Sequence, residues 1–247
     1  MTVFLRMLAG AAFGLAMPAA ASAQTAQSVV AANDRIDADK AQDEGRKPGE
    51  VLAFADVKRG DVVADFMAGG GYYTALIADL VGPSGLVYAV NPLGFYRADA
   101  WEKRVKADPN IRTMVSGARS MQLAPGSVDK IFAHLVFHDL YFESEEYKFP
   151  RLDVDFMVAN WFAAVKPGGT VTIVDHVGAA GDTRQIVQDV HRIDPQTVIR
   201  DMTRAGFILV DQSDVLRRSD DDLSKSVFDP SLRGNTDRFV MKFQKPA

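Results

Sequence analysis

The sequence predicts an α/β domain built on a doubly wound parallel sheet with helices on both faces. Apolar runs of strand length alternate with helical patterns along most of the chain. One run, Val62 to Phe66, leads into three glycines, Gly69 to Gly71, and then into a helical pattern and a second apolar run that ends at Asn91. A strand, a glycine loop, a helix and a strand within about 30 residues have the size of one βαβ unit. A ligand bound by such a unit lies over the loop, at the carboxyl ends of the strands.

Composition is consistent with one globular domain and excludes some partners. The chain has 247 residues, of which 47% are hydrophobic and 24% charged, enough to bury one full core. Its net charge of −4 argues against a nucleic-acid partner, because binding a phosphate backbone needs a basic face. There is no cysteine, so disulfides, lipoprotein attachment and thiol catalysis are excluded.

The first 23 residues have the pattern of a secretory signal peptide. Met1 to Arg6 carries one positive charge, Met7 to Ala20 is apolar and rich in alanine, and Ala21 to Ala23 has small residues where signal peptidase cuts. We therefore predict cleavage after Ala23, a periplasmic or secreted protein and no stable membrane insertion after cleavage. A membrane-tethered N-terminus is the alternative, although the apolar run is short for a permanent anchor.

The remaining elements follow in order. Residues 24–47 are polar with little periodicity, so we expect a mobile arm before a helix that begins near Pro48, and we assign residues 48–247 to one domain. Asp194 and Pro195 predict a helix start, and Gly206 predicts the end of that helix. The segment 216–235 is a long loop, which we expect over the active-site face. Strands are predicted at about 62–66, 86–90, 111–115, 129–134, 170–175, 207–211 and 237–243.

The spacing of these motifs resembles the class I S-adenosylmethionine-dependent methyltransferases, whose first motif is an acidic residue followed by a Gly-x-Gly-x-Gly loop. Here Asp65 is the acid, and Met67, Gly69 and Gly71 occupy the three glycine positions. The resemblance covers roughly residues 46–245, because other family motifs follow at the expected distances, at 82–85, 127–132 and 165–169. Segments 191–195 and 233–239 resemble those of predicted methyltransferases with export signals.

The resemblance implies a Rossmann-like seven-stranded mixed sheet with an antiparallel last strand, and S-adenosyl-L-methionine as cofactor. It places Asp65 at the amino-acid end of the cofactor, Asn91 where a carboxylate usually binds the ribose, and Gly117 where an acidic residue usually contacts the adenine. Asparagine lacks the charge that makes such bonds strong, so Met67, Asn91 and Gly117 all depart from the family. The predicted cofactor-binding residues are Asp65, Met67, Gly69, Gly70, Gly71, Asn91 and Gly117.

Four histidines, His134, His138, His176 and His191, fall where the fold puts the active face. Histidine titrates near neutrality and can take a proton from a hydroxyl or amine nucleophile. We predict His138 with Asp139, and then His134, as catalytic residues, because the family often places polar groups just past the fourth strand. A capping or core hydrogen-bonding role is the alternative for each histidine.

A metal site is the second interpretation of these histidines. His134 and His138, at i and i+4, share a face if their segment is helical, and His176 with Asp175 can complete the ligand set. Without a second closely spaced ligand pair the pattern is weak, and we predict no metal. The aromatic residues at 137–149 are expected to form a packed face rather than a substrate cage.

Two hypotheses on function follow. The first is an exported methyltransferase that acts on a small molecule, with catalysis mostly from positioning. The second is a binding protein on the methyltransferase fold, because fold does not fix function. The altered cofactor residues and an exported location, where no supply of S-adenosylmethionine is evident, are the case for the second. The sequence does not determine the substrate or the oligomeric state.

Overall fold

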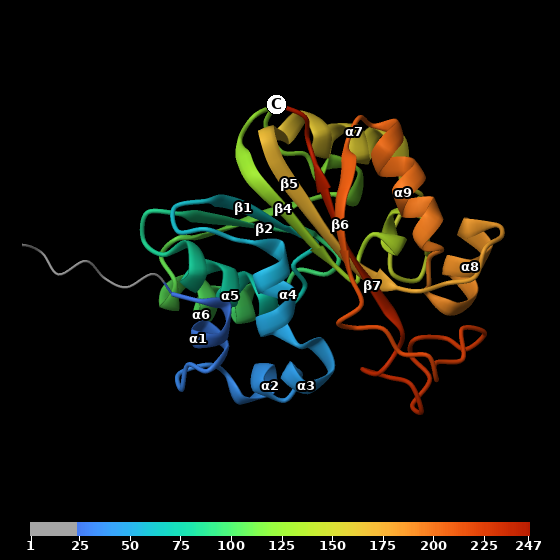
Figure 1. Ribbon diagram of the computed structural model, residues 1–247, viewed down its shortest axis with the longest axis horizontal. Coiled ribbons are helices and arrows are strands. Elements are labelled where there is room, and N and C mark those ends of the chain that lie inside the picture. The colour runs from blue at the N-terminus through green and yellow to red at the C-terminus, as the bar shows by residue number, and fades with distance from the viewer. Residues whose placement is uncertain (1–23) are drawn as a thin grey trace, which may run out of the picture.

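The computed structural model describes residues 24–247 (Figure 1). The predicted signal segment, residues 1–23, lies outside the described residues. Among the residues that are described, none of the helices combines the length and the apolar character needed to cross a membrane.

A seven-stranded mixed sheet forms the centre of the molecule, with the order β3-β2-β1-β4-β5-β7-β6. The first five strands are parallel to their neighbours, whereas β7 runs antiparallel between β5 and β6. This order confirms the predicted fold, and its direction reverses between β1 and β4, where doubly wound sheets bind ligands. The strands are β1 (Val62–Phe66), β2 (Leu86–Pro92), β3 (Ile111–Ser116), β4 (Val128–His134), β5 (Val165–His176), β6 (Ile208–Ser213) and β7 (Arg238–Gln244).

Strand positions agree with the prediction except at the start of β5. This strand begins at Val165, five residues before the predicted start at 170. The sequence predicts no strand at its first residues, which include Pro167, Gly168 and Gly169. They stay in the sheet because the N–H of Gly168 donates to the carbonyl of Lys245 at 3.0 Å, and the N–H of Lys245 donates to that of Gly169 at 3.0 Å.

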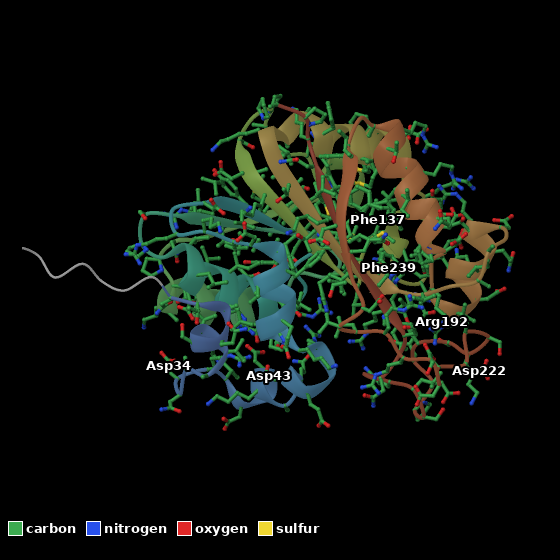
Figure 2. The ribbon with its side chains drawn as sticks, viewed as in Figure 1. Asp34, Asp43, Phe137, Arg192, Asp222 and Phe239 are labelled. Carbon is green, nitrogen blue, oxygen red and sulfur yellow. The ribbon has the colours of Figure 1, made fainter. Side chains whose placement is uncertain are left out.

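Helices cover both faces of the sheet (Figure 1). α1, α4, α5 and α6 form one apolar layer with β1 and β2, and α7 and α9 form the other. In Figure 2, Phe137 and Phe239 lie in the interior, whereas Asp34 and Asp222 lie at the periphery. The helices are α1 (Ala26–Val30), α2 (Asp37–Lys40), α3 (Asp43–Arg46), α4 (Pro48–Ala55), α5 (Tyr72–Val81), α6 (Ala98–Ala107), α7 (Val154–Ala164), α8 (Thr183–Val190) and α9 (Pro195–Arg204), with short 3₁₀ helices η1 (Ala118–Ser120) and η2 (His138–Leu140).

The ends of α9 follow from local chemistry, as predicted. Asp194 is the N-cap, and its side chain accepts a hydrogen bond from the N–H of Gln196 at 2.9 Å. Pro195 occupies the first helical position, where no N–H is needed. Just past the C-cap, Gly206 has a φ of +106°, which glycine adopts without strain.

The N-terminal segment 24–47 differs from the mobile polar arm that we expected. It forms α1, α2 and α3, and Val29 of α1 is buried where α1 packs on α4 and α5. Arg35 pairs with Asp43 at 2.6 Å, and Arg104 of α6 pairs with Asp39 at 2.9 Å. These ion pairs explain how a polar segment without periodicity is held on the domain. We call this segment the N-terminal cover.

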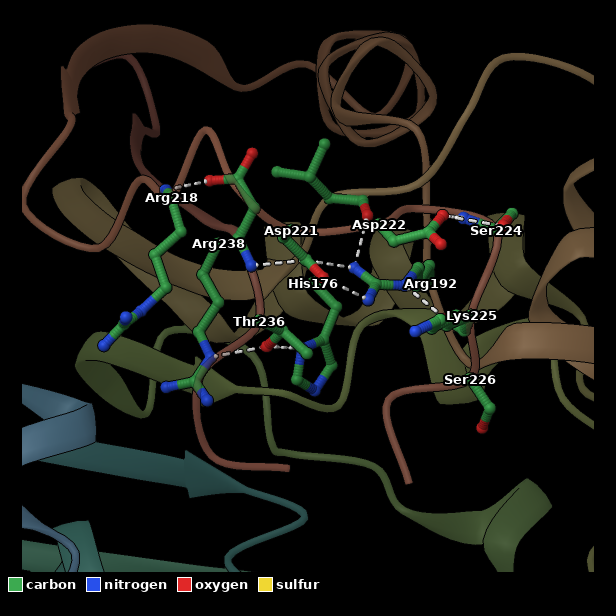
Figure 3. A network of polar contacts seen from close by, with 12 residues as sticks. His176, Arg192, Arg218, Asp221, Asp222, Ser224, Lys225, Ser226, Thr236 and Arg238 are labelled. Carbon is green, nitrogen blue, oxygen red and sulfur yellow. Dashed lines mark hydrogen bonds and ion pairs between the residues drawn. The ribbon is translucent and has the colours of Figure 1, made fainter. Parts of the chain in front are cut away.

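The loop between β6 and β7 is also fixed to the domain. Arg192 and Asp221 form a bidentate pair at 2.7 and 2.9 Å, with both side chains fully buried (Figure 3). On the other side of the loop, Arg238 Nη1 donates to the carbonyl of Gly45 in the N-terminal cover at 2.9 Å. The cover and the loop therefore meet over the carboxyl end of β5.

Candidate functional site

A cavity of about 290 Å³ lies over the glycine loop, at the carboxyl ends of β1 and β4. The loop forms its floor, His134, Leu135 and Val136 form one side, and the N-terminal cover forms its roof. No residue of the cover was predicted to belong to the site. The cover contributes Asp39, Gln42 and Arg46.

The glycine loop turns through left-handed backbone conformations. The φ angles are +52° at Met67, +56° at Gly69 and +79° at Gly71. Methionine thus stands at a position where glycine would be unstrained, which explains the glycine at this position of the motif that the loop resembles. The N–H of Gly71 donates to the carbonyl of Ala68 at 2.9 Å and closes the turn before α5 begins.

Gly70 and Gly71 serve different purposes. A Cβ on Gly71 would lie 2.7 Å from Arg104 Cδ and 2.8 Å from Trp101 Cη2, so this glycine makes room for α6 rather than for a ligand. A Cβ on Gly70 would meet no atom within 4 Å, and Gly70 lines the cavity. Of these two glycines, Gly70 is therefore the one at which a ligand can come close to the backbone of the loop.

Asp65 supplies a buried carboxylate at the floor of the cavity. It is the fourth of the five residues of β1, and Thr74 Oγ1 of α5 donates to its Oδ2 at 2.5 Å. Burial raises the pKa of Asp65 to about 7, against the opposing effects of this hydrogen bond and of the positive charges of Arg46 and Arg104. Near neutral pH this carboxyl group is therefore divided between its protonated and charged forms, and a cation bound beside it would favour the charged form.

Arg46 supplies the opposite charge in the same cavity. Its guanidinium lies 4.4 Å from the ring centroid of Tyr72, a cation–π distance. Within residues 24–247 it has no ion pair and no side-chain hydrogen bond. The cavity therefore presents a carboxylate and a guanidinium that are not paired with each other.

Asn91 and Gly117 lie away from this cavity. Asn91 is fully buried beneath the loop, where its Oδ1 accepts a hydrogen bond from the N–H of Gly69 at 3.0 Å. Its Nδ2 is buried without a hydrogen-bond partner among the described residues. Gly117 follows β3, and a Cβ there would meet no atom within 4 Å. Contacts of these two residues with ribose and adenine stay a prediction.

His134 lines the cavity, and its environment favours the neutral ring. Burial, and then the positive charges of Arg46 and Arg238, hold its pKa well below the usual range. Its ring lies 4.6 Å from that of Tyr73. His134 Nε2 is buried and has no hydrogen-bond partner within residues 24–247.

His138 and Asp139 are not among the residues that line the cavity. His138 begins η2 rather than continuing a helix from His134, so the condition for a shared helix face is not met; Leu135, with a φ of +58°, turns the chain between them. His138 is buried, with its Nδ1 2.7 Å from Asp175 Oδ1 and its Nε2 3.5 Å from an oxygen of Asp139.

The charged groups around His138 determine whether its ring carries a proton. Burial alone lowers its pKa, but the carboxylates of Asp175 and Asp139 outweigh burial and raise the pKa of His138 to about 9. Burial also raises the pKa of Asp139 to about 6. A histidine that already carries a proton cannot accept one at neutral pH. Among residues 24–247, no group of three or more His, Cys, Asp or Glu side chains has the arrangement of a metal site.

A second cavity of about 560 Å³ adjoins the first, and the two share Gln42, Arg46 and Leu135. It lies between the N-terminal cover and the loop before β7. His176, at the end of β5, and Arg238, at the start of β7, form its inner wall. The predicted long loop contributes Phe228 and Arg233, so it does lie over this face.

Comparisons with known proteins agree with this geometry. Residues 64–173, from β1 to β5, match the methyltransferase domain family. No curated protein matches the chain.

Solved structures share the fold at low identity. A SAM-dependent methyltransferase from Aquifex aeolicus is 22% identical, with a TM-score of 0.53 over 79% of this chain and 87% of that one. An S-adenosylmethionine-dependent methyltransferase from Mesorhizobium loti is 15% identical, with a TM-score of 0.57 over 83% and 100%. The Burkholderia thailandensis 1,6-didemethyltoxoflavin-N1-methyltransferase, solved with that compound and S-adenosylhomocysteine, is 16% identical, with a TM-score of 0.56 over 84% and 81%.

Proposed function

We propose that this chain is a class I S-adenosylmethionine-dependent methyltransferase that transfers the methyl group of S-adenosylmethionine to a small molecule; the match of residues 64–173 to the methyltransferase domain family supports this. The observation that carries the proposal is the pair of opposite charges in the cavity over the glycine loop. The amino-acid end of the cofactor bears an ammonium and a carboxylate. Asp65 and Arg46 offer the complementary charges in one cavity.

The residues of the cavity fit this end of the cofactor. Among the described residues, Asp65 has only Thr74 as a side-chain hydrogen-bond donor, so it retains lone pairs for an ammonium. The guanidinium of Arg46 can donate two parallel hydrogen bonds to a carboxylate. The open side of Gly70 lets a ligand approach the backbone of the loop. Asp39, engaged with Arg104, holds the roof in place.

When bound, the cofactor supplies an electrophilic methyl group on a sulfonium sulfur. The protein's part is to bind, to orient and to remove a proton from the acceptor where the acceptor has one. His134 is the candidate for contacting the proton that the acceptor loses, because its Nε2 has no protein partner among the described residues. Its lowered pKa keeps the ring neutral and makes it a weak base. The ring of Tyr73 packs against the imidazole and restricts its orientation.

A small molecule is the acceptor that fits best. The chain is acidic, with a net charge of −4, which disfavours nucleic acid. The second cavity, of about 560 Å³, has the volume of a site for a small organic ligand.

Calorimetric titration of the purified protein with S-adenosylmethionine and S-adenosylhomocysteine tests the proposal. We expect saturable binding that Asp65→Asn and Arg46→Gln each weaken. Arg59→Gln is the matched control, because Arg59 is exposed and lines a cavity at the amino-terminal edge of β2. Absence of heat at millimolar ligand with folded protein would contradict the proposal.

We also propose that the segment 1–23 directs export and is removed after Ala23. The charged start, the apolar centre and the small residues at 21–23 support this. Mass spectrometry of the natively produced protein should find Gln24 as the first residue. An intact Met1 in the cytoplasm would contradict export.

One observation favours a binding protein as the second candidate function. The side chain at the expected ribose position, Asn91, is used to hold the loop, and Trp101 Nε1 of α6 donates to the carbonyl of Gly69 at 3.1 Å. The Asn91 side chain and the backbone of the loop at Gly69 are thus already hydrogen-bonded within the protein, where the resemblance expects contacts with the cofactor. Binding of S-adenosylhomocysteine separates the two candidates, because only the methyltransferase requires it.

A further inference from the structure

Positive charge is concentrated around the second cavity. Three of its lining residues are arginines, Arg46, Arg233 and Arg238, and its only acidic lining residue is Glu44. The chain as a whole is acidic, so this concentration runs against the overall charge. A cavity lined by one sign of charge attracts ligands of the opposite sign.

Arg238 is the most buried of the three, and its position is fixed by the backbone. Its Nη1 and Nη2 donate to the carbonyls of Gly45 and Gly234, each at 2.9 Å, and its Nε donates to Thr236 Oγ1 at 3.1 Å. A guanidinium has five N–H donors, so two remain without a protein acceptor. Figure 3 shows this side chain extending from β7, with Thr236 between it and His176.

No carboxylate within residues 24–247 forms an ion pair with any of the three arginines. Burial, and then the positive charge of Arg46, lowers the pKa of Arg238 to about 10, although Tyr73 and the carboxylate of Asp175, which is not ion-paired with Arg238, act in the opposite direction. By contrast, the fully buried Arg192 is neutralised by Asp221. A buried cation without a partner is expensive, and an anionic ligand would remove the cost.

Apolar side chains form the rest of the wall. Leu135 and Val227 line the cavity, and Phe228, 56% exposed, stands at its edge. An exposed aromatic side chain beside a charged cavity suits a ligand with an apolar body and a charged end.

We propose that the second cavity is the acceptor site and that it selects a small organic anion, with an apolar body against Phe228 and its carboxylate or phosphate on Arg233 and Arg238. This proposal depends on the proposed function in one respect, since it takes the bound anion to be the molecule that receives the methyl group. Because the two cavities share Arg46 and Leu135, a ligand held there lies beside the cavity over the glycine loop.

His176 contributes a neutral polar group to the same wall. Its Nδ1 lies 2.7 Å from Thr236 Oγ1, so its Nε2 is the ring nitrogen without a protein hydrogen bond among the described residues. Burial, and then the positive charges of His138, Arg238 and Arg192, lowers its pKa well below the usual range. The neutral ring can hydrogen-bond the acceptor without repelling or neutralising the arginines.

Ligand-observed NMR with matched probes tests the selection. The probes are benzoate, phenyl phosphate and 4-hydroxybenzoate, each compared with a neutral analogue: benzamide, phenol and 4-hydroxybenzamide. At low ionic strength at least one anion should bind about tenfold or more tightly than its neutral analogue, and added salt should weaken this binding. Comparison of benzoate and 4-hydroxybenzoate with phenyl phosphate shows whether the cavity prefers a carboxylate or a phosphate group.

Two substitutions of exposed arginines provide the matched comparison. Arg233→Ala should weaken the anion about two- to fivefold, as for an exposed ion pair, whereas Arg59→Ala, outside this cavity, should leave it unchanged. Arg238→Lys keeps the charge but loses the planar fork, and should weaken the anion further if the variant folds. The Arg233 comparison stands even if the Arg238 variant does not fold.

The outcomes separate this inference from the proposed function. If all anions bind no better than their neutral analogues, or if Arg233→Ala and Arg59→Ala behave alike, the inference is wrong. S-adenosylhomocysteine is titrated into the same protein. If S-adenosylhomocysteine does not bind but the anions still bind more tightly than their neutral analogues, the methyltransferase proposal and the role of this cavity as acceptor site are both overturned. The selectivity of the cavity for anions is then still established.

Discussion

Valine substitutions at Gly70 and Gly71 should separate cofactor binding from folding. The two glycines are adjacent in one loop but face different surroundings. Gly71 faces α6, whereas Gly70 faces the cavity. We therefore expect one variant to lose stability and the other to lose affinity.

The cost at Gly71 follows from two structural facts. Its φ of +79° is a left-handed conformation, which costs a residue with a Cβ about 1–2 kcal/mol. The Cβ would also lie 2.7 Å from Arg104 Cδ and 2.8 Å from Trp101 Cη2, an overpacking worth about 1–3 kcal/mol. Together these give a loss of roughly 2–5 kcal/mol in the free energy of unfolding. For a domain of this size the melting temperature should fall by about 4–20 °C.

The cost at Gly70 falls on the ligand. A Cβ there meets no protein atom within 4 Å, and the φ of this residue is not in the left-handed region. The free energy of unfolding should therefore change by no more than about 1 kcal/mol. The valine side chain would stand where a cofactor approaches the backbone. A clash of at least about 1.4 kcal/mol weakens binding tenfold or more.

Thermal unfolding and calorimetric titration with S-adenosylhomocysteine, done on both variants and the parent protein, provide the test. The reasoning is refuted if Gly70→Val binds with unchanged affinity, because the cofactor then does not approach this part of the loop. It is also refuted if Gly71→Val melts at the parent temperature, because α6 then does not press on the loop as described.

Two further predictions concern buried charges. The pKa of His138 is raised to about 9 from an ordinary value near 6.5, so its ion pair with Asp175 contributes fully below pH 6.5 and its contribution is lost as pH rises through 9. Melting temperatures should fall over that window in the parent protein and more weakly in His138→Gln; equal slopes would contradict the assignment. Asp221→Asn leaves the buried guanidinium of Arg192 without its anion and should cost about 3–5 kcal/mol in denaturant unfolding, whereas a loss below about 1 kcal/mol would show that this pair does not hold the loop.

The sequence predicted the sheet well because buried parallel strands are continuous apolar runs. β1 occupies the predicted residues 62–66, and the antiparallel β7 was expected from the resemblance. The start of β5 was missed because its first residues include Pro167 and two glycines. They stay in the sheet only because backbone partners from the C-terminal residues reach them, and sequence patterns do not report such long-range pairing.

The candidate site was predicted in part. Asp65 and the glycine loop carry a local signal, since the turn must follow the strand within a few residues. Arg46 carries none, because its place over the loop depends on ion pairs such as Asp39 with Arg104, 65 residues apart in sequence. A cluster of charges in the cover was visible, but charge clusters are usually solvated. The histidines show the same limit, since a single left-handed residue, Leu135, sends His134 into the cavity and His138 into the interior.

Asn91→Asp tests whether the asparagine serves the loop or the ligand. If its role were to contact a ribose, a carboxylate would add charge-assisted hydrogen bonds and tighten cofactor binding several-fold. The structure leads to the opposite expectation, because Asn91 is fully buried and, within residues 24–247, the N–H of Gly69 is the only donor to its side chain.

A carboxylate in that place loses several kcal/mol of solvation and regains about 1.5–3 kcal/mol from one charged hydrogen bond. We therefore expect a net loss of stability of about 1–3 kcal/mol at pH 7 and no gain in affinity. The buried acid would have a raised pKa, so its cost should be absent near pH 4 and should grow as pH rises. Melting curves from pH 4 to 8, with S-adenosylhomocysteine titrations at equal ionic strength, measure both effects. Tighter binding with unchanged stability would mean that the side chain reaches the cofactor and that the buried position described here is not the one used in the complex.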